Sequence, residues 1–305
     1  IGIDNVMNYF QPEIGSIFDD SQEARAAATL GISLFHTTFN VLNVVLLIGF
    51  VPAITRFVER FQKEKEDSDK AFRLKYISGG LMSSSELSIA QAFKEIELFG
   101  RLIEKMHISF TGLFFKKQNK QEKFLKKIKK REQITDNIEL EVAEYLTKIS
   151  SSNLTEKSTR KIRLMHSMIN DLERIGDIYF QMSKTFELME NEEIKLPQDA
   201  VDEIGNMLDL VREDIKIMRT NMESFGDEID LNPAIEIEQE INRKRDMMKD
   251  AHYKRLEDGV YNSKAGVTYL DYLTRLEKIG DHIFNVNEAL AGKKMKIHSD
   301  LITEG

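Results

Sequence analysis

Two short stretches of the chain are nearly identical. Residues 172–177 read LERIGD and residues 276–281 read LEKIGD. The match extends further, since Phe180 recurs as Phe284 and the amide Gln181 recurs as the amide Asn285. A second pair, EQITD at residues 132–136 and EQEIN at residues 238–242, recurs at nearly the same separation. Two segments repeated at one separation indicate an internal duplication.

The composition is typical of a folded helical protein. Of the 305 residues, 31% are charged and 41% are hydrophobic, while only 4 are Pro and 16 are Gly. Because helix-breaking residues are so few, the sequence predicts an all-α fold. The chain has no Cys, so a metal would need oxygen or imidazole ligands. A net charge of -8 disfavours general binding of nucleic acid.

Six helices are expected in the larger part of the chain. Turn-forming residues separate them, and their approximate ranges are 86–117, 120–150, 155–190, 198–226, 233–259 and 263–293. The repeated hexamer falls in the third and in the sixth helix. The pattern therefore predicts two antiparallel three-helix bundles, at about 85–190 and 198–293, within one domain over residues 85–293.

The region before this domain has a different character. Residues 26–55 contain no Asp, Glu, Lys or Arg, and this run exceeds the roughly 20 residues that a membrane-spanning helix needs. It predicts a transmembrane segment between an amphipathic lead-in at 1–25 and a linker at 56–84; residues 294–305 form a tail. The alternative is a buried core helix of a soluble protein. Basic residues after Thr55 place the domain that follows in the cytoplasm.

Polar residues form a stripe along the first half of this uncharged run. His36, Thr37 and Asn40 lie on it and are candidates for a transport path. The alternative is that they make hydrogen bonds between packed helices.

Acidic residues recur one helical turn apart in the repeated segments. Like charges at this spacing cost an isolated helix about 0.2–0.5 kcal/mol per pair, which favours a cation opposite them. Carboxylate oxygens suit hard ions such as magnesium, calcium, manganese or ferric iron. The alternative is a surface lattice of ion pairs, because Arg174 and Lys278 follow the repeated Glu residues.

The duplicated motif resembles the PhoU family of phosphate-signalling regulators. In that family E/D-x-x-x-D motifs bind metal clusters, and the resemblance implies that residues 85–293 do the same. The fourth motif departs, because Glu238 is followed by Asn242, and Asp246 is the candidate substitute. The implied metal ligands are Glu132, Asp136, Glu173, Asp177, Glu238, Asp246, Glu277 and Asp281.

The uncharged segment resembles the end of the membrane domain in bacterial sodium-dependent phosphate cotransporters, which carry a PhoU-like domain after it. The matching residues are 28–40 and the junction at 76–87. The resemblance implies phosphate as substrate, sodium as coupling ion, an inner-membrane location and a homodimer. The Gln-Ser-Ser motifs of that family are absent, and one span cannot form a midplane site, so the chain is expected to be part of a longer protein.

A basic run occupies residues 116–131, where Glu122 is the only acid. It admits three interpretations: a solvated helix face, a nucleic-acid contact, or a surface for anionic lipid headgroups that uses Lys126, Lys127 and Lys130. Net charge and sparse aromatic residues argue against nucleic acid as a partner.

The leading hypothesis for function is part of a sodium-dependent phosphate transporter, with a cytoplasmic PhoU-like domain that senses or gates. The first alternative is a metal-binding PhoU-type regulator that acts on a separate transporter. The second is a single-pass signalling protein with a coiled-coil rod. No enzyme is expected, since the sequence has no activated nucleophile and no phosphate-binding glycine loop.

Overall fold

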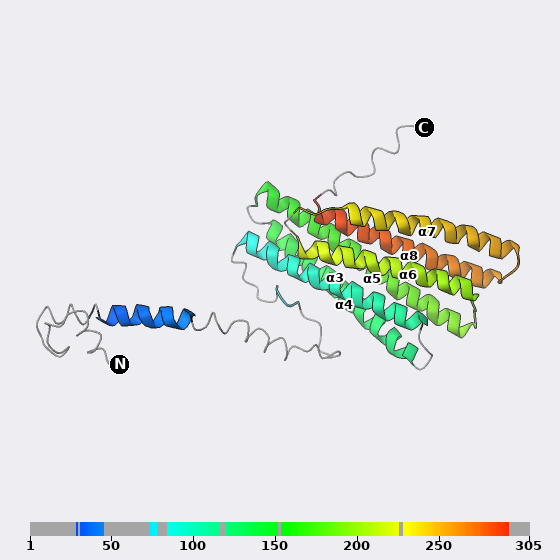
Figure 1. Cartoon of the computed structure of the whole chain (residues 1–305), viewed down its shortest axis with the longest axis horizontal. Coiled ribbons are helices and arrows are strands. Elements are labelled where there is room, and N and C mark those ends of the chain that lie inside the picture. The colour runs from blue at the N-terminus through cyan, green and yellow to red at the C-terminus, as the bar shows by residue number, and fades with distance from the viewer. Residues whose placement is uncertain are drawn as a thin grey trace, which may run out of the picture. The chain divides into compact units, whose positions relative to one another are not determined.

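The computed structural model describes residues 29, 31–45, 74–77, 84–115, 120–151, 154–225 and 228–292. The chain divides into two units, Ile1–Ala71 and Phe72–Gly305. The second unit contains six long helices, and the all-α prediction is confirmed (Figure 1). They are α3 (Ser85–Phe115), α4 (Gln121–Ser150), α5 (Glu156–Asn191), α6 (Gln198–Glu223), α7 (Asn232–Glu257) and α8 (Ser263–Leu290).

The six helices form two antiparallel three-helix bundles. Helices α3, α4 and α5 pack on one another, and so do α6, α7 and α8. In the first bundle Phe124 on α4 lies against Gly112 on α3, while Tyr145, further along α4, reaches back to Gln91. In the second bundle the C-terminal part of α7 meets the start of α6, where Arg255 binds Asp199. The predicted pair of bundles is therefore present.

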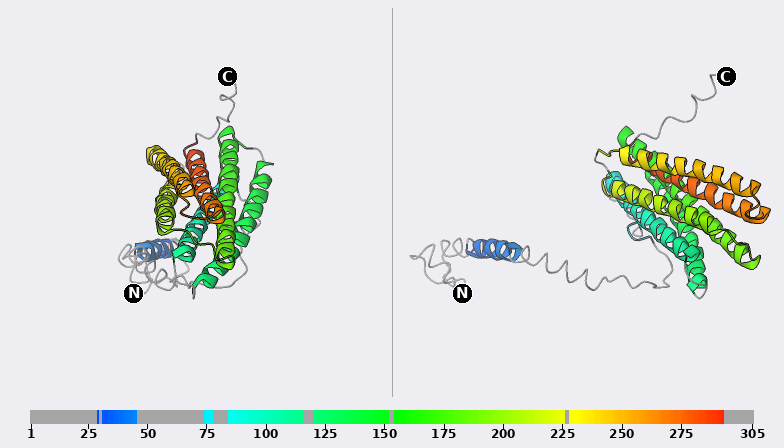
Figure 2. Two further views of the ribbon diagram at one scale, coloured as in Figure 1. Left: turned by 90° about the vertical axis from the view of Figure 1, so that its right-hand side faces the viewer. Right: turned by 45° about the vertical axis from the view of Figure 1, so that its right-hand side comes forward.

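The two bundles pack through equivalent helices. Helix α5 lies antiparallel to α8, and α3 lies antiparallel to α6. Thr185 near the end of α5 donates to Asp271 near the start of α8, at 2.8 Å, whereas Asp171 further back on α5 accepts from Asn285 at 3.1 Å. Helix α4 lies on one side of the packed helices α5 and α8, and α7 lies on the other side (Figure 2). The duplicated halves are thus related by an approximate two-fold axis.

Two glycines of the repeated hexamer set the distance between neighbouring helices. A Cβ on Gly176 of α5 would lie 3.0 Å from Oγ1 of Thr135 on α4. A Cβ on Gly280 of α8 would lie 3.2 Å from Cδ1 of Ile241 on α7. Both contacts are tighter than a side chain normally makes, so glycine allows the close approach in each half.

The first unit contains a helix over residues 31–45. Among the described residues, none of the helices combines the length and the apolar character needed to cross a bilayer. The predicted transmembrane segment over residues 26–55 is described only at residue 29 and over residues 31–45, and it stays a prediction. The rest of the segment, the lead-in at 1–25, most of the linker and the tail lie outside the described residues.

Asp214 on α6 is fully buried in the second unit. Neither of its carboxylate oxygens has a hydrogen-bond partner among the described residues. Burial raises the pKa of Asp214 well above its usual range, and the nearby charge of Glu238 adds to the shift. Folding at neutral pH therefore has to desolvate this carboxylate or protonate it.

We expect Asp214→Asn to stabilise the protein at pH 8. The folded state keeps the Asp214 proton at pH values where the unfolded state has lost it, so the free energy of unfolding falls as pH rises above about 4. Removing the titration should raise that free energy by on the order of 1–3 kcal/mol at pH 8 and change little at pH 4. Urea unfolding at both pH values measures it.

The exposed Asp209 on the same helix supplies the control, since Asp209→Asn should leave stability nearly unchanged at either pH. A loss of stability in Asp214→Asn at pH 8 would contradict the prediction.

Candidate metal centre

The first bundle brings three of the predicted ligands together. Glu132 and Asp136 lie on α4, and Asp177 lies on α5. Each offers one carboxylate oxygen, and these oxygens all lie within 4.8 Å of one another. We call the facing acids of α4 and α5, with Glu173 included, the first face.

The helix contact explains why these side chains converge. Thr135 packs against Gly176, and acids flank this contact on both helices. Since α4 and α5 run antiparallel, Glu132 and Asp136 both lie close to Asp177, and Glu139, further along α4, acts on Glu173. The hydroxyl of Thr135 donates to the backbone oxygen of Glu132 at 2.6 Å. Its proton is therefore not available to the neighbouring carboxylates.

The first face concentrates negative charge. Burial raises the pKa of Glu132, and the charges of Asp136 and Asp177 raise it further. The pKa of Asp136 is raised by burial and by Asp177. Burial raises the pKa of Glu173 to about 7, with further contributions from Asp177 and from Glu139. Burial is thus the main reason why these acids resist ionisation, and the neighbouring carboxylates add to it.

The nearest cation on the first face is Arg174. Its Nε lies 3.8 Å from Glu173 and its Nη1 lies 3.9 Å from Asp177, and 64% of its side chain is exposed. Ion pairs that are this long and this exposed to solvent contribute little to the stability of the fold. Among the described residues, the buried Oδ1 of Asp136 has no hydrogen-bond partner. The donor set of the first face therefore fits a hard cation bound by oxygen.

The second bundle presents the equivalent surface of α7 and α8, which we call the second face. It does not repeat the cluster. Asn242 replaces an acid, and its amide donates to Glu238. Nη1 of Arg245 donates to Glu277 at 2.7 Å and to Oδ1 of Asn242 at 2.9 Å. Nζ of Lys278 donates to Asp281 at 2.7 Å. Cations of the chain itself thus occupy the oxygens of this face.

Asp246 does not replace the missing acid of the second face. Its carboxylate accepts from Nε of Arg245 at 2.9 Å, and 64% of its side chain is exposed. In the described part of the chain, the only group of three or more acidic or histidine side chains close enough to share an ion is the one on the first face. The second face therefore does not fit a metal cluster.

Sequence reasoning missed two residues that decide this difference, Glu139 and Arg245. The sequence contains the signal that identifies them. When the alignment of residues 132–136 with residues 238–242 is extended by three residues, Glu139 aligns with Arg245. An acid in the first half is thus replaced by a base in the second.

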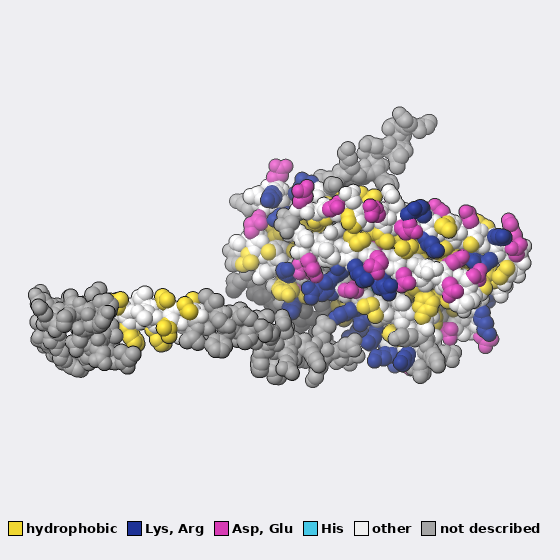
Figure 3. Space-filling view, viewed as in Figure 1, with side chains coloured by type: hydrophobic (Ala, Val, Ile, Leu, Met, Phe, Trp, Pro, Cys, Tyr) yellow, Lys and Arg dark blue, Asp and Glu magenta, His cyan; other side chains and the backbone are white. Residues whose placement is uncertain are grey.

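The remaining predicted site residues belong to other helices or other parts of a helix than the first face. His36, Thr37 and Asn40 are exposed on the helix over residues 31–45, and the hydroxyl of Thr37 donates to the backbone oxygen of Ser33 at 2.9 Å. Lys126 is exposed on α4 and pairs with Glu122 at 2.6 Å, while Lys127 and Lys130 are half-buried. Figure 3 shows Lys and Arg side chains gathered along the lower part of the helical unit in that view.

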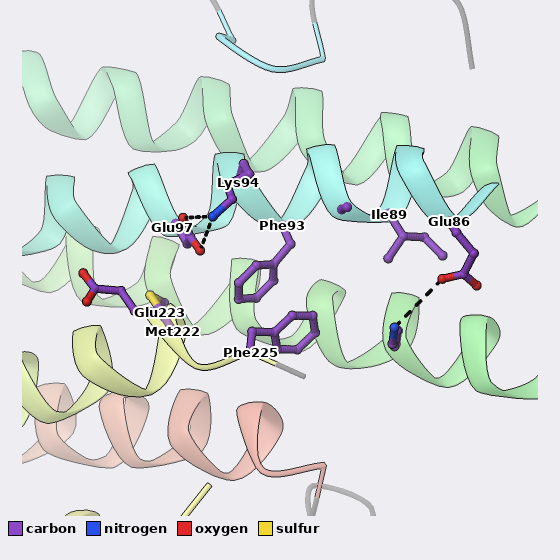
Figure 4. A pocket seen from close by; sticks show the side chains of 10 residues that line it. Glu86, Ile89, Phe93, Lys94, Glu97, Met222, Glu223 and Phe225 are labelled. Carbon is purple, nitrogen blue, oxygen red and sulfur yellow. Dashed lines mark hydrogen bonds and ion pairs between the residues drawn. The ribbon is translucent and has the colours of Figure 1, made fainter. Parts of the chain in front are cut away.

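A separate pocket of about 290 Å³ lies between α3, α5 and α6 (Figure 4). The rings of Phe93 and Phe225 stack in it, with centroids 3.7 Å apart. Its charged residues already have partners: Lys94 binds Glu97 at 2.9 Å, and Lys161 lies 4.0 Å from Glu86. The pocket therefore lacks the unpaired charge that distinguishes the first face.

Comparisons with known proteins agree with this architecture. The family model "PhoU domain" matches residues 96–186, which include α4, most of α3 and most of α5. PhoU from Pseudomonas aeruginosa superimposes with a TM-score of 0.61 at 15% identity, over 68% of this chain and 97% of that one. PhoU from Streptococcus pneumoniae gives 0.57 at 16% identity, over 68% and 95%.

The helical unit has the PhoU fold. The resemblance expected from the sequence is thereby confirmed for the fold. PhoU homolog 1 from Thermotoga maritima, a phosphate-specific transport system accessory protein, is 25% identical over 57% of this chain and 76% of its own length.

Another similar protein is YjbB from Escherichia coli O157:H7, which is described by name as an inorganic phosphate export protein. It is 24% identical over 49% of this chain, and the match spans 27% of YjbB. The chain thus covers about a quarter of the length of this relative. The sodium/phosphate cotransporter family is not among the similarities found, so that part of the resemblance stays a prediction.

We expect Glu173→Gln to stabilise the metal-free protein at pH 8. The pKa of Glu173 is about 7 in the folded chain against 4.5 ordinarily, so the free energy of unfolding falls as pH rises between these values. Glutamine does not titrate, and the gain should be on the order of 1–2 kcal/mol at pH 8 and close to zero at pH 4. Urea unfolding with a chelator present measures it.

Glu187→Gln, on the same helix and outside the first face, is the matched control and should show no such pH dependence. Destabilisation of the chelated Glu173→Gln protein at pH 8 would mean that a partner already neutralises this carboxylate.

Proposed function

We propose that this helical unit is a metal-binding regulatory domain of a phosphate transport system. The observation that carries the proposal is the carboxylate cluster of the first face, which is built on a PhoU fold and has a buried oxygen without a partner. The similar proteins named above are a transport-system accessory protein and a phosphate export protein, which supports a role linked to phosphate transport.

In this proposal Glu132, Asp136 and Asp177 hold the cation, and Glu173 completes the negative surface around it. The cation adds positive charge between these carboxylates, and the oxygen ligands suit magnesium, manganese or ferric iron. Binding removes the repulsion between α4 and α5 and so stabilises their close contact. No catalytic step is proposed, and the domain acts by a change in packing.

The domain regulates a transporter in one of two arrangements. In the first it is the cytoplasmic part of a longer sodium-dependent phosphate transporter in the inner membrane, where it senses or gates. In the second it acts on a separate transporter; the similar protein of Thermotoga maritima is named an accessory protein of a phosphate-specific transport system. The match to a quarter of the length of YjbB favours the first arrangement. A homodimer and contact of the Lys126 surface with lipid headgroups belong to the same proposal.

We expect the full chain to bind Mn²⁺ through the first face. Asp136→Asn combined with Asp177→Asn should weaken binding by at least about tenfold, because two of three converging carboxylates are lost. Equilibrium dialysis with metal analysis measures the affinity, with iron and magnesium tested in parallel.

The matched control for this experiment is Glu144→Gln, which changes an exposed acid of α4 that pairs with Lys148. It should bind as tightly as the unchanged chain. A chain that retains none of these metals at any tested concentration would contradict the proposal.

The two arrangements differ in what precedes Ile1 in the coding sequence. Membrane spans with Gln-Ser-Ser motifs there would support a regulatory part of one transporter chain. A start codon close to Ile1 would favour the separate regulator.

A further inference from the structure

We infer that Arg245 acts as a built-in cation that closes the second face to metal, so that the duplicated unit has one metal centre and not two. The inference rests on the proposed function for the first face and goes beyond it. Its basis is the arrangement of side chains around Arg245.

The contacts between helices define which residues of the two halves are equivalent. Gly176 packs on Thr135 in the first half, and Gly280 packs on Ile241 in the second. Thr135 is therefore equivalent to Ile241. Counting from these two positions along α4 and α7 pairs Asp136 with Asn242 and Glu139 with Arg245. The correspondence thus stands on structure as well as on the repeated sequence.

The equivalent pairs have opposite electrostatics. In the first half the residue equivalent to Arg245 is the acid Glu139, on the same helix as Glu132 and Asp136. In the second half Arg245 occupies the position of Glu139 and donates to Glu277, the equivalent of Glu173, at 2.7 Å. The second half thus has an ion pair between α7 and α8 where the first half has acids on the equivalent helices α4 and α5.

Arg245 also uses the oxygens that a metal would need. One guanidinium nitrogen bridges Glu277 and Oδ1 of Asn242, at 2.7 and 2.9 Å. The other side of Asn242 donates to Glu238. Only 21% of the Arg245 side chain and 15% of the Glu277 side chain are exposed, so the pair is largely shielded from water. A metal ion would have to break this ion pair, and it would then lie next to the positive charge of Arg245.

No other acid in the described second half restores a cluster. Asp246 is exposed and paired with Arg245 itself. Asp214 is buried near Glu238, but the two do not belong to any group of three ligating side chains in the described residues. Changing Arg245 and Asn242 to the residues of the first half should therefore be both necessary and sufficient to open the second face.

A reciprocal exchange in the full chain tests the inference. Asn242→Asp with Arg245→Glu gives the second face the acids of the first, and Mn²⁺ binding measured by equilibrium dialysis should increase to about twice the amount per chain. Asp136→Asn with Glu139→Arg gives the first face the residues of the second, and Mn²⁺ binding should be lost. This second variant should also melt at a higher temperature than the unchanged chain when a chelator is present.

Two results would overturn the inference. One is Mn²⁺ retained by the chain that carries Asp136→Asn with Glu139→Arg, with retention abolished by adding Glu277→Gln, because the second face would then bind metal despite Arg245. The other is a folded Asn242→Asp, Arg245→Glu variant, verified by circular dichroism, that gains no Mn²⁺. Arg245→Gln with Asn242→Asp is the milder variant if the double acidic change prevents folding.

The same measurements separate this inference from the proposed function. An unchanged chain that binds no Mn²⁺ contradicts the metal centre of the first face. The inference would still be supported if the Asn242→Asp, Arg245→Glu variant gained binding, and overturned if it did not. Metal on both faces of the unchanged chain would overturn the inference and leave the metal centre of the first face intact.

Discussion

The close contact between neighbouring helices at Gly176 and Gly280 is the constraint on which the rest of the helical unit depends. A side chain at either glycine would hold its helix away from the next one. With glycine there, the acids that flank each contact on both helices are brought opposite one another. Packing and electrostatics are therefore set by the same residues, since the arrangement that closes each bundle also concentrates its negative charge.

The two halves resolve this repulsion in different ways. The second half carries its own cation, because Arg245 lies between Glu277 and Asn242 in a largely shielded position. In the first half the exposed Arg174 lies 3.8 Å from Glu173 and 3.9 Å from Asp177, and burial together with neighbouring carboxylates raises the pKa values of Glu132, Asp136 and Glu173. One half thus pairs its acids with a cation of the chain itself, whereas in the proposed function the other half takes its cation from solution. The two halves of the duplicated architecture are therefore expected to respond differently to a metal ion.

Helix α5 connects that response to the rest of the unit. On one side it carries Glu173 and Asp177 of the first face, and on another it makes the contacts with α8. Asp171 binds His282 at 3.0 Å and Thr185 binds Asp271 at 2.8 Å. A cation that draws α4 and α5 together therefore acts on the helix that also holds the two bundles together. This geometry supplies a direct mechanical connection between the metal centre and the packing of the bundles.

Much of the fold could be predicted from sequence because helix formation is local. Scarce Pro and Gly, turn signals at intervals and the repeated hexamer are sufficient for an all-α, duplicated unit with acids on equivalent helices. Of the predicted transmembrane segment over residues 26–55, the structure describes residue 29 and the helix over residues 31–45, so that segment stays a prediction.

The sequence by itself determined that acids recur one turn apart, but only the tertiary structure decided which of them meet. Glu132, Asp136 and Asp177 converge because the Gly176–Thr135 contact sets the register of α4 against α5. Asp246 had the right spacing along α7 and still lies outside the cluster, paired with Arg245. Spacing along one helix fixes a face of that helix, whereas a binding site requires the register between two helices, which depends on contacts between residues far apart in the chain.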